Sequence, residues 1–136
     1  MSKIQLYREV IEFSNDVLGI DCKDFQQELF DNLADYEHCF EIDNGSESYR
    51  FISDNAIEDI HVESVKDMVT DCYLSGTDLD KYSWIAIDWE ETAENLRSSD
   101  GYGHHFSGYD GSEEEYDFTD VEGSGVKFGY WIFRTN

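Results

Sequence analysis

Apolar residues recur every three or four positions in the first part of the chain, which is the spacing of one buried helix face. This spacing predicts a helix from Ser2 to about Leu18, ended by Gly19. It predicts a second helix from Lys23 to Tyr36, with Asp21 as its cap. The expected inner faces consist of Ile4, Tyr7, Val10 or Ile11, and Val17 or Leu18 in the first helix, and of Phe25, Leu29, Leu33 and Tyr36 in the second.

The pattern then changes to alternation, which is typical of a half-buried strand. Phe40 and Ile42 alternate with carboxylates before the turn residues Asn44-Gly45, and Tyr49 and Phe51 alternate after them. The sequence therefore predicts a β-hairpin at about residues 38–52. A third helix is predicted over His61–Tyr73 after a short turn at 55–59, with an inner face of Val65, Met68, Val69 and Cys72.

The stretch from Ser83 to Arg97 begins as a short apolar run and continues as a helix. The run from Trp84 to Ile87 predicts a short strand. Asp88 is a good N-cap, and Glu91 stands three residues later, which is the spacing of a capping box. The predicted inner face is Trp89, Ala93 and Leu96, which leaves Glu90, Glu91 and Glu94 outside.

The C-terminal part of the chain predicts the rest of a sheet. Residues 98–103 have the composition of a loop, and His105–Tyr109 and Tyr116–Phe118 are predicted as edge strands. Val126–Phe133 is apolar on both faces near its end, which is typical of a central strand. Because no repeat, linker or heptad pattern interrupts it, the chain is predicted as a single acidic α+β domain over residues 1–136. Its N-terminal helices pack on a small, mostly antiparallel sheet, with strands mainly in the C-terminal half plus the hairpin.

Charge changes this picture more than any other property. Nine Lys and Arg residues stand against 32 Asp and Glu residues, which gives a net charge of −23 at pH 7. Such an excess repels itself and weakens the compact state. It argues against direct nucleic-acid binding, which needs cations to displace counterions, and against binding to anionic membranes. A basic protein is the partner that this charge favours, and an aromatic content of 15% argues against disorder.

The predicted helices place this charge in rows. Asp24, Glu28, Asp31 and Asp35 are spaced by four, three and four residues on one helix face. Like charges at this spacing cost roughly 0.2–0.5 kcal/mol per pair. Carboxylates four residues apart stand about 6 Å apart along a helix, which is of the same order as the 3.4 Å phosphate spacing of one DNA strand. The candidate partner-binding carboxylates are Asp24, Glu28, Asp31 and Asp35; Glu63, Asp67 and Asp71; Glu90, Glu91 and Glu94; and Glu113, Glu114 and Glu115.

Catalytic and metal-binding motifs give little support to an enzyme. The sequence has no G-x-S-x-G, no H-E-x-x-H and no phosphate-binding glycine loop, so neither catalysis nor a cofactor is expected. His104 and His105 with Asp100 form a weak candidate metal site. The segment from Asp110 to Glu115 is rich in oxygen ligands but lacks the spacing of a calcium-binding loop, so no metal is expected there either.

Cysteine usage and hydropathy bear on the cellular compartment. Cys22, Cys39 and Cys72 are widely spaced without a C-x-x-C motif, which predicts buried, reduced thiols in a cytoplasmic protein. There is no apolar run near 18 residues, and the N-terminus is polar and then amphipathic. Neither a membrane span nor a signal peptide is expected.

The segment Ile87-Asp88-Trp89-Glu90-Glu91-Thr92-Ala93-Glu94-Asn95-Leu96 resembles the acidic helix start near the C-terminal end of ArdA-type antirestriction proteins. It is also similar to related small proteins of phages and mobile elements. In these proteins a D-W-E-x-T-A-x-x-L segment precedes a strand with an aromatic, Arg-containing end, which Tyr130-Trp131-Ile132-Phe133-Arg134 matches here. The resemblance implies a DNA mimic. Its carboxylates would imitate phosphates in the DNA-binding groove of a restriction–modification or CRISPR effector complex.

The expected function is therefore stoichiometric inhibition of a basic nucleic-acid-binding complex in the host cytoplasm. An immunity or antitoxin protein that neutralises a basic toxin, such as a nuclease, is the alternative from another class. An acidic protein adapted to salt is a third interpretation, in which the carboxylates are only solvated. The sequence is compatible with a monomer or with a homodimer, whose two-fold axis would double the length of an acidic row.

Overall fold

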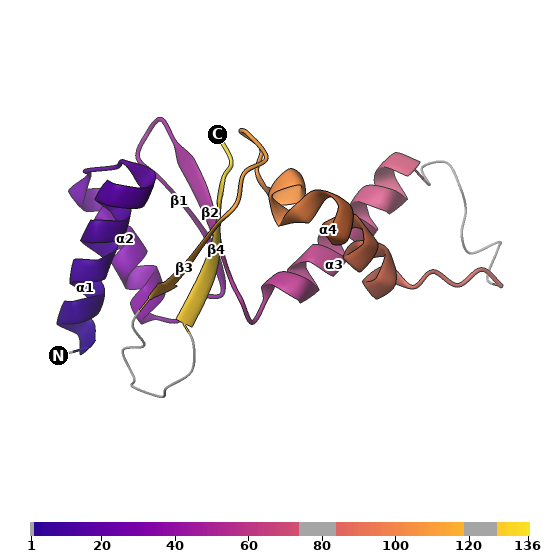
Figure 1. Cartoon of the computed structure of the whole chain (residues 1–136), viewed down its shortest axis with the longest axis horizontal. Coiled ribbons are helices and arrows are strands. Elements are labelled where there is room, and N and C mark those ends of the chain that lie inside the picture. The colour runs from indigo at the N-terminus through magenta and orange to yellow at the C-terminus, as the bar shows by residue number, and fades with distance from the viewer. Residues whose placement is uncertain (1, 74–83, 119–127) are drawn as a thin grey trace.

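The computed structural model describes residues 2–73, 84–118 and 128–136. The architecture is α+β, as predicted, with the hairpin near its predicted position and two further strands in the C-terminal half. Figure 1 shows the arrangement of these elements. In chain order they are α1 (Ser2–Phe13), the π-helical turn η1 (Ser14–Leu18), α2 (Lys23–Ala34), β1 (Cys39–Asp43), β2 (Ser48–Ser53), α3 (Ile57–Met68), the π-helical turn η2 (Val69–Tyr73), α4 (Trp89–Phe106), β3 (Glu114–Phe118) and β4 (Phe128–Arg134).

The four strands form one antiparallel sheet in the order β1-β2-β4-β3. Phe51 of β2 is paired with Phe40 of β1 on one side and with Ile132 of β4 on the other. The prediction of a central C-terminal strand is therefore confirmed, and β3 is an edge strand as predicted. Residues 126 and 127, at the start of the predicted strand, lie outside the described residues.

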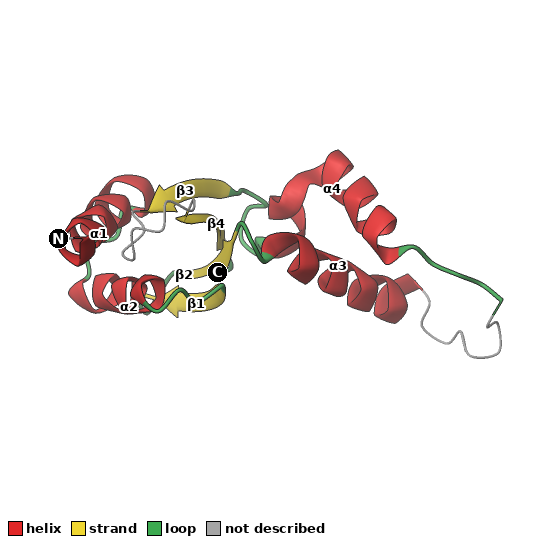
Figure 2. Cartoon of the chain, turned by 90° about the horizontal axis from the view of Figure 1, so that it is seen from below, coloured by secondary structure: helices red, strands yellow, loops and turns green. Residues whose placement is uncertain are grey.

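Side chains of β2 and β4 point alternately to the two faces of the sheet, and both faces are covered. On one face, Phe51 and Ile132 belong to a core with residues of α1 and α2. On the other face, Ile52 and Phe133 belong to a second core with Phe106 of α4 and with α3. Figures 1 and 2 show α1 and α2 on one side of the sheet and α3 and α4 on the other. Because α3 and α4 extend away from the sheet as a pair, the molecule is elongated.

Helix α1 buries a face that only partly overlaps the predicted one. Val10 is buried as predicted, but Leu6 and Phe13 complete the core stripe, whereas Ile4 is 65% exposed and Tyr7 is 38% exposed. Both stripes have helical spacing, so periodicity alone does not separate them. The ring of Phe13 fixes which face of the helix is buried, because it packs against Phe51, Tyr116 and Phe118 of the sheet.

The core side of α2 agrees with its prediction at Phe25, Leu29 and Leu33, which are buried, but the predicted cap and C-terminal end do not agree. The helix ends at Ala34, and Tyr36 lies beyond it with a φ of 55°, so the predicted end at Tyr36 was wrong. The N-cap is Cys22, in extended conformation and without a side-chain cap hydrogen bond, so the assignment of Asp21 as the cap was wrong.

The prediction of buried thiols was also wrong for two of the three cysteines. Cys39 and Cys72 are exposed, Cys22 is half-buried, and all three are free. Cys72 lies in η2, whose wider π-helical turn rotates the following residues away from the face that an α-helical period predicts.

Helix α4 replaces two elements that the sequence predicted differently. Residues 85–88 form no strand, and Trp84 is 79% exposed, so the predicted strand at 84–87 was wrong. Asp88 does cap the helix, because its Oδ1 accepts a hydrogen bond from the Glu91 N–H at 3.0 Å. The helix then continues through the predicted loop at 98–103 and into the predicted strand at 105–109. It is interrupted only at Gly101, whose φ of 74° is one that other residues rarely adopt.

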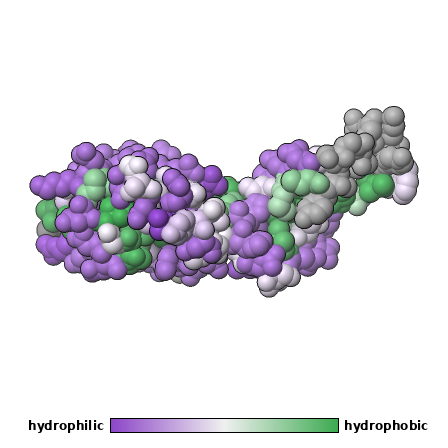
Figure 3. All heavy atoms as spheres, turned by 90° about the horizontal axis from the view of Figure 1, so that it is seen from above, coloured by the Kyte–Doolittle hydropathy of each residue, from purple (hydrophilic) through white to green (hydrophobic). Residues whose placement is uncertain are grey.

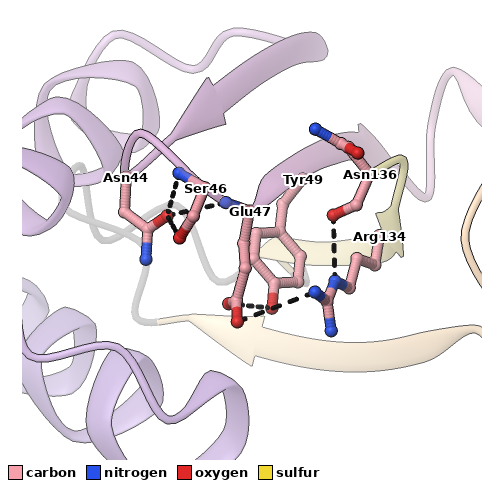
Figure 4. A network of polar contacts seen from close by, with 6 residues as sticks. All are labelled: Asn44, Ser46, Glu47, Tyr49, Arg134 and Asn136. Atoms are coloured by element: carbon pink, nitrogen blue, oxygen red, sulfur yellow. Dashed lines mark hydrogen bonds and ion pairs between the residues drawn. The ribbon is translucent and has the colours of Figure 1, made fainter.

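A polar network ties the hairpin turn to the C-terminal strand (Figure 4). The Asn44 side-chain oxygen accepts a hydrogen bond from the Glu47 N–H at 2.8 Å. The Glu47 carboxylate accepts a hydrogen bond from the Tyr49 hydroxyl at 3.0 Å and pairs with Arg134 of β4 at 3.7 Å. Burial, together with the hydrogen bond to Glu47, raises the pKa of Tyr49 to about 12, so this hydroxyl remains a donor at neutral pH.

The burial of α1 makes a matched pair of substitutions informative. Leu6→Ala removes a fully buried side chain and is expected to lower the free energy of unfolding by about 2–5 kcal/mol. Ile4→Ala on the exposed face is expected to change it by less than about 0.5 kcal/mol. Urea denaturation followed by circular dichroism measures both values. A larger loss for Ile4→Ala than for Leu6→Ala would contradict the helix rotation described here.

Candidate functional site

All of the sequence-predicted carboxylates are exposed in the structure. They do not converge on one patch. One row lies on α2 beside the sheet, and the others lie on the elongated α3–α4 pair and on the segment that leads into β3. Hydrophilic residues cover most of the face shown in Figure 3. The candidate surface is therefore extended along the long axis of the molecule.

The row on α2 is the most regular of these groups. Asp24, Glu28, Asp31 and Asp35 lie opposite the buried stripe of this helix. Asp31 accepts a hydrogen bond from Gln27 Nε2 at 2.9 Å. Among the described residues, none of the four carboxylates forms an ion pair. The last turn of α2 also carries no basic residue, so Asp35 lies uncompensated at the negative end of the helix dipole.

Three arginines of the described residues, Arg50, Arg97 and Arg134, make contacts away from this row. Arg50 pairs with Glu41 across β1 and β2 at 2.8 Å. Arg134 pairs with Glu47, and its guanidinium lies 3.7 Å from the centre of the Tyr109 ring. Such pairs hold strands and turns in place, and the charge of the α2 row stays available to a partner.

Helices α3 and α4 bring together carboxylates that are distant in sequence. Glu63, Asp67 and Asp71 are exposed as predicted, the first two on α3 and Asp71 on η2. On another side of the pair, Glu90 and Glu94 of α4 share a cleft of about 280 Å³ with Glu58 and Asp59 of α3. Glu91 is exposed but does not line this cleft.

The sequence interpretation missed Glu58 and Asp59, because it placed them in a turn before the third helix. The structure begins α3 at Ile57, so both carboxylates lie in its first turn. Acidic residues are favoured in the first turn of a helix because they compensate its dipole. This signal is present in the sequence and would have moved the predicted start of the helix.

One guanidinium group already lies beside these carboxylates. Arg97 contacts Glu94 Oε1 at 3.4 Å, and its guanidinium carbon lies 4.8 Å from the centre of the Tyr102 ring. Arg97 and Tyr102 both line the cleft. Arg97 is part-exposed, and exposed pairs of this kind contribute only about 0.2–1 kcal/mol.

His61 lines the same cleft and is 2% exposed. Its ring makes edge contacts with Tyr102 at 5.1 Å and His105 at 5.2 Å, measured between ring centres. Its Nε2 atom has no hydrogen-bond partner among the described residues. Burial, followed by the nearby His105 and Arg97, lowers the pKa of His61 to about 4, while Glu94 opposes the shift. The ring is therefore neutral at pH 7 and retains one unprotonated nitrogen.

Glu113 has a structural role that the sequence interpretation did not recognise. Its carboxylate accepts hydrogen bonds from the backbone N–H groups of Tyr102 at 3.1 Å and Gly103 at 3.0 Å. These N–H groups begin the helical turn that restarts after Gly101, so Glu113 acts as its cap from a distant position. Glu114 and Glu115 are exposed at the start of β3.

A metal site and a membrane-spanning helix have less support. His104, His105 and Asp100 line a second cleft together with Asp67. Within the described ranges, however, no group of three or more His, Cys, Asp or Glu side chains has a geometry that would hold a metal ion. The helices described here also include none that combines the length and apolar character needed to cross a membrane.

No family model matches the chain, and no match is found among curated proteins or solved structures. The candidate site therefore consists of the features given above. These are an uncompensated row on α2, a second row on α3, and an acidic cleft between α3 and α4 with a buried histidine in its lining.

The capping role of Glu113 predicts a difference between two neighbouring carboxylates. Glu113→Gln weakens the two hydrogen bonds to the restarted turn and is expected to lower the free energy of unfolding by about 1–2 kcal/mol. Glu114→Gln removes the same charge from an exposed strand position and is expected to have little effect or to stabilise slightly. Urea denaturation of both variants measures the difference. Equal values would contradict the capping role.

Acidification is expected to destabilise the protein through His61. The unfolded chain takes up this proton near pH 6.5, whereas the folded protein does so only near pH 4. The stabilisation is therefore present above pH 6.5 and lost as the pH falls toward 4, by about 2 kcal/mol at pH 5. His105, whose pKa is also lowered chiefly by burial, acts in the same direction.

Ordinary carboxyl groups titrate mostly below pH 5, so urea denaturation between pH 7 and 5 isolates the histidine effect. His61→Gln is expected to remove most of the pH dependence in this range. A variant that keeps the wild-type slope would show that His61 is not its source.

Proposed function

We propose that this protein is a DNA mimic that inhibits a host defence complex by stoichiometric binding. Its carboxylates take the place of DNA phosphates in the binding groove of a restriction–modification or CRISPR effector complex, in the cytoplasm of the host cell. The observation that carries the proposal is the regular, exposed row of carboxylates on α2, which forms no ion pair within the part of the chain that the structure describes.

The arrangement of charge supports a partner built for a phosphate backbone. Rows on α2 and on α3 repeat carboxylates every three or four residues, at a spacing of the same order as that of phosphates. A solvated surface without a partner gains nothing from such rows, because like charges at this spacing destabilise their own helix. The rows therefore carry a stability cost that binding to a cationic groove offsets.

The shape of the molecule supports the same partner. The α3–α4 pair extends away from the sheet, so acidic groups are spread along an elongated body and not gathered at one point. A groove that binds duplex DNA is also elongated and is lined with Lys and Arg along its length. Opposite potentials of this kind chiefly raise the association rate, and a smaller number of fixed contacts then determines which partner is bound. The resemblance of residues 87–96 to ArdA-type antirestriction proteins favours a defence complex as that partner.

An immunity protein against a basic nuclease is the alternative. The acidic cleft between α3 and α4 suits this alternative as well, because a small basic toxin also presents cationic side chains. The two functions differ in what the target does after binding. A mimic displaces DNA from a multi-subunit defence complex, whereas an immunity protein forms a tight pair with one small toxin.

Competition with DNA tests the proposal directly. A fluorescent DNA duplex is bound to a purified restriction–modification complex or CRISPR effector, and its anisotropy is followed as the protein is added. Release of DNA near one equivalent, suppressed by added salt, is the expected result. Normal DNA binding by both classes of complex in the presence of excess protein would overturn the proposal.

The α2 row has a matched control. A variant with Asp24→Asn, Glu28→Gln, Asp31→Asn and Asp35→Asn is expected to compete about tenfold less well or worse. A control variant removes the same charge from four separate elements or loops, as Glu12→Gln, Asp21→Asn, Glu37→Gln and Asp43→Asn. This control is expected to compete nearly as well as the wild type. Equal losses in the two variants would show that net charge, and not the row, determines competition.

A further inference from the structure

The cleft between α3 and α4 combines four carboxylates with groups that these carboxylates do not explain. Tyr102 lines the cleft and is 4% exposed, with Arg97 over its ring face, and His61 is buried in the lining with no hydrogen-bond partner for its Nε2 atom among the described residues. Glu58 and Asp59 come from one helix and Glu90 and Glu94 from the other, so the cleft exists only when the two helices are packed together. A solvated acidic surface needs neither the aromatic face nor the buried nitrogen.

We propose that this cleft binds the guanidinium group of an arginine side chain supplied by the protein partner. The inference rests on the proposed function for the existence of a basic partner, and it names the contact that holds that partner in place.

The hydrogen-bonding groups of the cleft match a guanidinium. Apart from Arg97 and the Tyr102 hydroxyl, the polar side chains that line it are carboxylates and a histidine. Carboxylates accept hydrogen bonds, and a neutral histidine ring accepts one at its unprotonated nitrogen. A guanidinium presents five N–H donors and no acceptor, so it complements this set. The unpartnered Nε2 of His61 would gain a donor when the ring proton is on Nδ1.

The chain's own Arg97 shows where such a group is held. Its guanidinium lies 4.8 Å from the centre of the Tyr102 ring and contacts Glu94 at 3.4 Å. A planar, weakly hydrated cation is suited to an aromatic face, whereas the ammonium group of lysine is compact and strongly hydrated. Arg97 is part-exposed, and an incoming arginine that displaces it makes the same kinds of contact with the ring and with Glu94 that Arg97 gives up.

A titration with N-acetyl-arginine amide at low salt tests the inference on the whole protein. The ring signals of His61 are followed by NMR, with the isosteric but uncharged N-acetyl-citrulline amide as the control ligand. The arginine compound is expected to shift the His61 signals saturably, and the citrulline compound is expected to leave them in place. The lysine analogue is expected to bind about tenfold more weakly than the arginine compound, or worse.

Two double variants with equal charge locate the binding site. Glu90→Gln with Glu94→Gln removes two carboxylates of the cleft and is expected to weaken binding of the arginine compound about tenfold. Glu91→Gln with Glu114→Gln removes two exposed carboxylates that do not line the cleft. This variant is expected to bind the arginine compound with an affinity within about twofold of the wild type. All four positions are exposed, so both variants are expected to fold.

The inference falls if the arginine compound leaves the His61 signals unchanged, if the citrulline compound shifts them equally, or if the two double variants bind alike. Its failure is separate from failure of the proposed function. If the wild type displaces DNA but does not bind the arginine compound, only the cleft assignment is overturned. If it binds the arginine compound but displaces no DNA, the cleft assignment stands and the DNA-mimic proposal is overturned.

Discussion

The two central strands, β2 and β4, are apolar on both faces, and the rest of the structure depends on this burial. Phe51 and Ile132 face one core, while the adjacent Ile52 and Phe133 face the other. Because neighbouring side chains of a strand point to opposite faces, each strand must be covered from both sides. Helices α1 and α2 cover one face, and the N-terminal end of α3 with the C-terminal end of α4 covers the other. The remainder of the α3–α4 pair extends beyond the sheet and makes the molecule long.

This division also determines how a net charge of −23 is tolerated. Each helix has one apolar face committed to a core and leaves its carboxylates on the opposite side. Distribution along an elongated body lowers the mutual repulsion of these charges relative to a compact sphere, since separations beyond the Debye length of about 8 Å are screened at physiological salt. Arginines are used where elements must be joined, as Arg134 joins β4 to Glu47 at the hairpin. Among the described residues, the carboxylates of the rows on α2 and α3 form no ion pair.

Features fixed by local sequence were predictable, and features fixed by distant contacts were not. The alternation of apolar and polar residues predicted the hairpin, and apolar residues on both faces predicted the central position of β4. Asp88 predicted the start of α4. Glu113 supports the turn after Gly101 from ten or eleven residues away, so local composition there indicated a loop instead of a helix. The carboxylate rows were predictable from helical spacing. The cleft was not, because it depends on the pairing of α3 with α4 and on a helix start that had been placed too late.

Under the proposed function, the rows would attract a basic partner through charge alone, whereas the cleft would discriminate between lysine and arginine. Exposed rows attract any cationic surface, because long-range attraction depends on net charge and is little affected by whether lysine or arginine supplies it. In the proposed binding mode the cleft would distinguish the two, because the Tyr102 ring and the His61 Nε2 atom, which has no hydrogen-bond partner among the described residues, suit a planar group with several donors. A lysine-rich protein would then be attracted without being held, whereas a groove that presents an arginine would be attracted and then fixed. Under the proposed function, selection among basic proteins would depend on the cleft, and the rate of association on the whole acidic surface.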